Sequence, residues 1–252
     1  MWPSRSSLAI VLLVAVALLV VGAGSPPAVA ADTPFANGQP AGARLDVPLR
    51  LIGETFHSDG SVFVGPDRFP YVAGIQTPSA DDPSATRLTM VQLAQLALAK
   101  HAGIAIYEHA RTESSVWVFS LGSVALLAQG KWQNYDPNPA PTPGPGDHVL
   151  TGTPSLEILP PELRLAVAEY MRTNDHVESP KIVLIIIRQE SGQVRQPFMM
   201  APNLPSTMFP TQASWYEELH RIEWFIPPTV DAVRPPVSPE AFEFWFRVVK
   251  PL

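Results

Sequence analysis

Proline placement constrains this chain more than any other feature, because proline fixes its own backbone angle and cannot donate a backbone hydrogen bond. The chain has 29 prolines in 252 residues, and five of them alternate between residues 137 and 145. Such alternation forces an extended, semi-rigid backbone that suits neither a helix nor a central strand. We therefore predict a proline-rich linker over residues 133–153 that separates an N-terminal unit at 49–132 from a C-terminal unit at 154–252.

The N-terminal unit combines strand and helix patterns. Asp59-Gly60 stands between two apolar runs, which is typical of the tight turn of a β-hairpin. Thr89 and Gln92 have the spacing of a capping box at the start of the clearest helix in the chain. The expected elements are paired strands at 49–52 and 61–64, a helix at 88–100, strands at 104–107 and 116–119, and a helix at 123–129 with Ser123 as its N-cap.

The C-terminal unit repeats this order of elements. Pro161 suits the first turn of a helix, and the continuous β-branched run at 182–187 indicates a strand buried on both faces. The expected elements are a helix at 161–172, strands at 182–187 and 194–200, a loop at 201–210, a helix at 212–225 and a helix that follows Ser238. We predict an α+β fold of antiparallel β-hairpins packed with helices, and two similar α-β-β-α halves remain an open alternative.

The first thirty residues have the features of an export signal. Arg5 precedes sixteen apolar or small residues at 8–23, and Ala28-Val29-Ala30 supplies the small-x-small pattern of a cleavage site. We expect a signal peptide at 1–30 that is removed after Ala30, a flexible lead-in at 31–48, and a periplasmic or secreted protein with no stable membrane insertion. An N-terminally anchored protein of the inner membrane is the alternative.

Composition excludes several classes of function. The chain has no cysteine, so disulfides, thiolate metal sites and cysteine nucleophiles are impossible, and an exported protein without disulfides fits a bacterial envelope. Its net charge is −6, and no two Lys or Arg residues are adjacent. Nucleic-acid binding needs a basic surface, so we expect no nucleic-acid partner. The expected partner is another envelope or secreted protein.

Catalytic and metal-binding motifs are absent from the sequence. It contains no glycine-rich phosphate loop, no serine nucleophile motif and no metal-ligand spacing of histidines, so we expect no cofactor and no metal. Glu217 and His220 share a helical face, but Glu217 is also placed to pair with Arg221 four residues later. The only catalytic candidates are residues near predicted turns, where a histidine beside a carboxylate can exchange protons near neutral pH: His57, Asp59, Glu108 and His109.

Aromatic and methionine side chains concentrate in the last third of the chain. Such side chains are enriched where proteins bind partners, and the proline-framed loop at 201–210 could form the rim of a groove. The candidate binding residues are Met199, Met200, Met208, Phe209, Trp215, Tyr216, Trp224 and Trp245.

These observations together favour an exported, non-enzymatic binding protein of the bacterial envelope, such as an inhibitor, an immunity-type protein or an accessory factor. Two alternatives are an envelope hydrolase with a histidine and carboxylate site, and a carrier of apolar ligands. The carrier requires a closed cavity of roughly 300 to 1,000 Å³.

Overall fold

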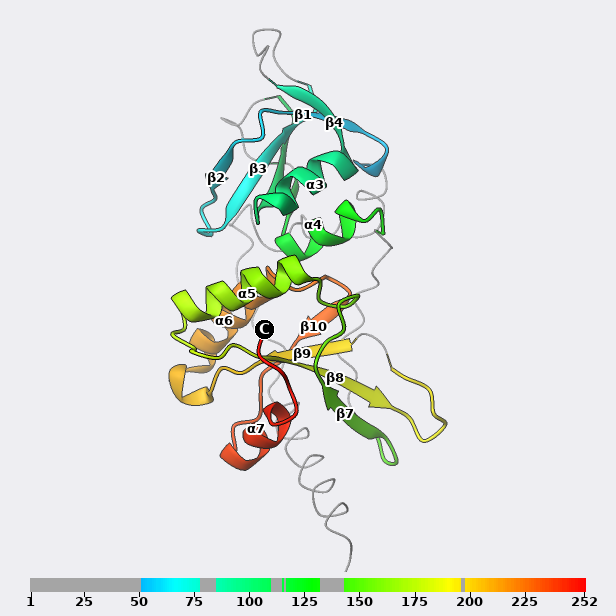
Figure 1. Cartoon of the computed structure of the whole chain (residues 1–252), viewed down its shortest axis with the longest axis vertical. Helices are drawn as coiled ribbons and strands as arrows, with labels where there is room; N and C mark the ends of the chain where they lie inside the picture. Colours follow the sequence, from blue (N-terminus) through cyan, green and yellow to red (C-terminus); the bar gives the residue numbers. More distant parts are fainter. Residues whose placement is uncertain (1–50, 78–84, 110–114, 116, 132–142, 196–197) are drawn as a thin grey trace, which may run out of the picture.

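Figure 1 shows the computed structural model of the chain, which describes residues 51–77, 85–109, 115, 117–131, 143–195 and 198–252. The predicted signal peptide, the lead-in and most of the alternating prolines lie outside these ranges. The described part contains five α-helices and ten strands in two sheets, which confirms the predicted α+β class.

The N-terminal half is built on a mixed six-stranded sheet in the order β4-β1-β3-β5-β6, with β2 also paired to β3. The strands are β1 (Thr55–Ser58), β2 (Val62–Val64), β3 (Pro70–Ile75), β4 (Thr86–Thr89), β5 (Gly103–Tyr107) and β6 (Trp117–Phe119). β3 and β5 run parallel, because helix α3 (Met90–Ala99) lies between them in the chain and returns it across the sheet.

The predicted hairpin of residues 49–52 with 61–64 is wrong. Leu51 and Ile52 are helical, and β1 and β2 do not pair with each other but both pair with β3. Gly60 has a φ of 70°, and the Asp59 carboxylate accepts a hydrogen bond from the Ser61 amide. These two residues therefore connect β1 to β2 without reversing the chain, and both strands run antiparallel to β3.

Helices α3 and α4 (Leu121–Ala128) cover one face of this sheet (Figure 1). The predicted capping box is confirmed, since the Thr89 hydroxyl accepts from the Gln92 amide and the Gln92 side chain accepts from the Thr89 amide. Helix α4 begins two residues earlier than predicted. Its N-cap is Ser120, whose hydroxyl accepts from the Ser123 amide, so the assignment of Ser123 as the cap is wrong.

The C-terminal half contains a four-stranded sheet in the order β10-β9-β8-β7. Its strands are β7 (His148–Gly152), β8 (Ile182–Arg188), β9 (Phe198–Pro202) and β10 (Val230–Ala232). The structure differs from the sequence prediction at β7, which falls within the predicted linker at 133–153. After Gly146 the chain has no proline until Pro154, so it can pair along the edge of β8, from His148 opposite Arg188 to Gly152 opposite Leu184.

Three helices cover the two faces of the second sheet. Alternate residues of β8 point to opposite faces: Ile182 and Leu184 join the core that includes α5 (Pro161–Thr173) and α6 (Gln212–Glu223). Val183 and Ile185 pack with α7 (Pro239–Phe246), whose position confirms the helix predicted after Ser238. The order of helix, two antiparallel strands and helix occurs in both halves, as α3-β5-β6-α4 and α5-β8-β9-α6.

One hydrophobic core joins the halves. It includes Tyr71 from β3 as well as Trp224, which follows α6, and the Trp224 indole N–H donates to the Tyr71 hydroxyl at 3.1 Å. The Trp224 ring also stacks on Phe69, with ring centroids 4.4 Å apart. At Gly122 in α4 the backbone of the other half approaches so closely that a Cβ atom would lie 2.0 Å from the Ile226 carbonyl oxygen. The halves are therefore closely packed against each other.

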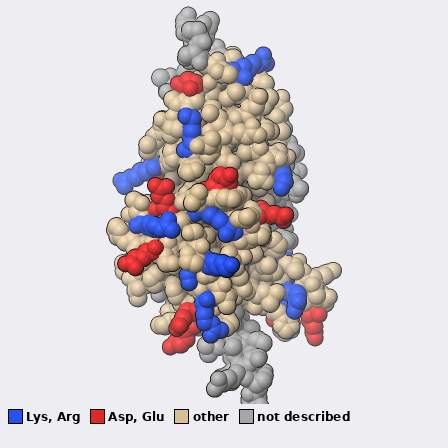
Figure 2. Space-filling view, viewed as in Figure 1, with Lys and Arg blue, Asp and Glu red and all other residues tan. Residues whose placement is uncertain are grey.

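Charged side chains of both signs are interspersed on the face shown in Figure 2, without a large area of one sign. Among the described residues, no helix is long and apolar enough to cross a membrane.

Candidate functional site

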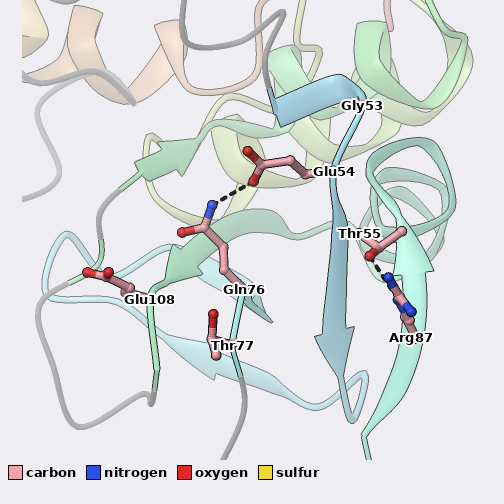
Figure 3. A pocket seen from close by; sticks show the side chains of 7 residues that line it. All are labelled: Gly53, Glu54, Thr55, Gln76, Thr77, Arg87 and Glu108. Carbon is pink, nitrogen blue, oxygen red and sulfur yellow. Dashed lines mark hydrogen bonds between the residues drawn. The ribbon is translucent and has the colours of Figure 1, made fainter.

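A groove of about 500 Å³ opens at one end of the N-terminal sheet. Its lining is almost entirely polar and comes from the ends of separate strands (Figure 3). We call it the polar groove, and its residues are Gly53, Glu54, Thr55, Gln76, Thr77, Arg87 and Glu108.

The parallel pairing of β3 and β5 determines where the polar groove lies. Carboxyl ends of neighbouring parallel strands meet at the same edge of a sheet, and ligands of α/β proteins commonly bind there. Gln76 and Thr77 directly follow β3, and Glu108 directly follows β5. The Gln76 amide donates to the Tyr107 carbonyl and the Thr77 amide donates to the Glu108 carbonyl, so the strand pairing continues into the groove.

The other lining residues reach this edge because β1 is antiparallel to β3. Glu54 and Thr55 stand at the start of β1, which lies beside the end of β3. Arg87 comes from the outer strand β4, and its Nε donates to the Thr55 hydroxyl at 2.9 Å. Four strands thus contribute polar groups to one site.

Hydrogen bonds hold the middle of the groove in place. The Gln76 side-chain amide donates to the Glu54 carboxylate at 2.7 Å, across the gap between β3 and β1. Glu54, Gln76 and Thr55 are half-buried, whereas Thr77, Arg87 and Glu108 are exposed. The groove therefore has an ordered polar floor and solvent-facing charged groups, which offer hydrogen-bond donors and acceptors to a polar ligand.

The structure brings only one of the four catalytic candidates to this groove. Glu108 lines it, and the neighbouring His109 ring lies 3.9 Å from the Glu108 carboxylate, with both side chains exposed. His57 pairs with Ile75, which pairs with Tyr107, so His57 is two strands away from β5, or roughly 10 Å. Asp59 follows the opposite end of β1 and fixes the bend at Ser61. The four residues are not gathered into one acid–base site.

The predicted aromatic and methionine binding residues differ in how far they are buried. Met199, Met200, Trp215 and Trp224 lie in the hydrophobic cores, because β9 and α6 turn their apolar faces inward. That burial does not fit a role in a surface groove. Phe209 and Trp245 are half-buried, and Met208 and Tyr216 are exposed. The sequence shows which residues are apolar, but burial depends on how the two halves pack together.

A second polar cluster is buried where α5 meets α6. The Tyr170 hydroxyl donates to one oxygen of Glu218 at 2.9 Å, and Arg221 donates to the other at 3.1 Å. Glu218 is 3% exposed and forms the ion pair with Arg221. The sequence predicted that Glu217 would pair with Arg221, so that prediction is wrong. Burial raises the pKa of the Tyr170 hydroxyl well above its ordinary value, and the nearby Glu218 carboxylate raises it further.

Asp175 stands beside this cluster with one carboxylate oxygen, Oδ2, buried and without a hydrogen-bond partner. The pKa of Asp175 is raised from 3.8 to about 7. Burial is the larger cause, and the nearby Glu218 carboxylate is the second. Within the described ranges, no group of three His, Asp or Glu side chains is placed to hold a metal ion.

Sequence reasoning missed five of the polar lining residues: Glu54, Thr55, Gln76, Thr77 and Arg87. Polar residues directly after a strand could have indicated Gln76 and Thr77. That indication requires β3 to be recognised as a strand first. Comparisons with protein-family models, with curated proteins and with solved structures found no match. The site is therefore interpreted from its geometry alone.

Proposed function

We propose that this chain is an exported, non-enzymatic binding protein of the bacterial envelope, and that its ligand site is the polar groove. The observation that carries the proposal is the convergence of polar side chains from four strands on an open space of about 500 Å³. That volume lies within the usual range for sites that bind small molecules, although this groove is more open and more polar than most such sites. The export pattern at 1–30 and the absence of cysteine support the location.

The geometry gives less support to the alternatives. The predicted hydrolase needs a histidine and a carboxylate within hydrogen-bond reach of each other in one site, and of the four candidates only Glu108 lines the polar groove. A carrier of apolar ligands needs an enclosed apolar cavity, whereas this groove is open and polar. A binding role requires no proton transfer, and it uses the groups that the groove does gather.

Blocking the groove tests the proposal. Thr77 is exposed within the groove, so Thr77→Trp fills the space without disturbing a buried contact. The matched control is Ser191→Trp, which places the same ring on the exposed turn between β8 and β9 in the other half. Wild type, blocked variant and control are purified after export from a bacterial host, and retained molecules are identified by mass spectrometry.

We expect a molecule that wild type and Ser191→Trp retain and that Thr77→Trp loses. If the blocked variant retains the same molecules as wild type, the groove is not the binding site and the proposal fails.

A further inference from the structure

The polar groove has opposite charges at its two ends. Figure 3 shows Glu108 at one end, Arg87 at the other, and Glu54 with Gln76 between them. The Glu108 carboxylate matches a ligand ammonium group, and the Arg87 guanidinium matches a ligand carboxylate. A ligand with a single charge would satisfy only one end.

The strand spacing sets the distance between these charges. Arg87 is hydrogen-bonded to Thr55 on β1, and Glu108 follows β5, which lies two strands away. Neighbouring strands are about 4.8 Å apart, so the backbones of β1 and β5 are separated by roughly 10 Å. An extended peptide spans about 3.3–3.6 Å per residue, so three residues place their termini at this separation.

The middle of the groove offers groups suited to a peptide backbone. Gln76 carries both a donor and an acceptor, and the hydroxyls of Thr55 and Thr77 can do either. Thr55 lies on β1, whereas Gln76 and Thr77 both follow β3, the neighbouring strand (Figure 3). A peptide backbone has N–H and C=O groups that can bond to these side chains, whereas an apolar chain has none.

We infer that the polar groove binds a short peptide of about three residues with both termini free, its amine at Glu108 and its carboxylate at Arg87. This inference rests on the proposed function, since it specifies the ligand of the same site. The recognition depends on the two termini and on the backbone, so the groove accepts small side chains of varied kind.

Calorimetric titration with trialanine tests the inference directly. Wild-type protein is titrated with trialanine, with N-acetyl-trialanine and with trialanine amide. Each blocked peptide lacks one terminal charge, and an ion pair with an exposed side chain is worth about 0.2–1 kcal/mol, or up to about fivefold in affinity. We therefore expect each blocked peptide to bind about two- to fivefold more weakly than trialanine.

Two variants assign each terminus to its residue. Glu108→Gln is expected to abolish the difference between free and acetylated peptide while retaining the effect of amidation, and Arg87→Gln is expected to do the reverse. Both side chains are exposed, so neither change removes a buried group. The controls Glu157→Gln and Arg188→Gln make the same charge changes at exposed positions in the other half.

The outcomes separate this inference from the proposed function. If trialanine does not bind, or if free and blocked peptides bind equally, the zwitterionic ligand is rejected. The Thr77→Trp comparison then decides independently whether the groove binds anything. If the variants Glu108→Gln and Arg87→Gln behave like their controls, the assignment of the termini is wrong.

Discussion

Asp175 is expected to make this protein less stable as the pH rises. Its side chain is buried against Glu218, and its pKa is raised from 3.8 to about 7 in the folded state. The folded protein therefore holds a proton that the unfolded chain releases above about pH 4. The proton on Asp175 therefore stabilises the folded state. This contribution is fully present below pH 3.8 and is lost as the pH rises through about 7.

The structure sets the size of this effect. One pKa unit corresponds to about 1.4 kcal/mol, so the full difference corresponds to at most about 4 kcal/mol. Arg221 also faces the cluster, and its positive charge lowers the pKa of Asp175, which opposes the two causes that raise it. Charges inside real proteins are screened more strongly than in a dry interior, so we expect about 2 kcal/mol between pH 4 and pH 8.

Asp175→Asn removes the titration while keeping the shape of the side chain. We expect the variant to unfold like wild type at pH 4 and to be more stable by about 2 kcal/mol at pH 8. Urea unfolding followed by tryptophan fluorescence at a series of pH values measures the difference. Glu157→Gln is the control for loss of one exposed carboxylate and is expected to change stability little at any pH.

All other titrating groups are the same in Asp175→Asn and in wild type. Their contributions to the pH dependence of stability therefore cancel when the two proteins are compared. If their difference in unfolding free energy stays constant between pH 4 and pH 8, or if the variant is the less stable protein at pH 8, the argument is refuted.

Three further predictions concern the junction of the two halves and the export signal. Gly122→Ala places a methyl group against the Ile226 carbonyl and should destabilise the protein by roughly 1–3 kcal/mol in urea unfolding, whereas Gly152→Ala, with open space around it, should cost far less. Trp224→Phe removes the buried hydrogen bond to the Tyr71 hydroxyl, and we expect a loss of about 1 kcal/mol in the same assay. N-terminal sequencing of the exported protein should begin at residue 31, and a start at residue 1 would instead favour the anchored alternative.

Local sequence signals predicted most of the individual elements. Thr89 and Gln92 marked the start of α3, because a capping box depends only on residues close together in the chain. The apolar run at 182–187 indicated β8 in the same way, since its burial is visible in its composition. Pro161 likewise marked the first residue of α5.

Long-range pairing explains what the sequence did not reveal. Pro70 and Gly74 interrupt the usual strand pattern in β3, and Gly74 is needed because a Cβ there would lie 2.7 Å from the Leu93 side chain. Without β3, the parallel pair with β5 cannot be inferred. The polar groove follows from that pair, so its lining residues other than Glu108 were found only in the structure.

The same reason applies to the aromatic residues. The spacing around Trp215 identified one apolar face of α6, but Trp224 is buried because Tyr71 and Phe69 come from the other half. Composition alone could not separate core residues from binding residues.

The central claim is that the polar groove holds the ligand of this protein. A crystal structure of the exported protein with its retained ligand tests that claim most directly. We predict ligand density between Glu108 and Arg87, in contact with Glu54 and Gln76. Density at another surface, with the groove containing only solvent, would contradict the account.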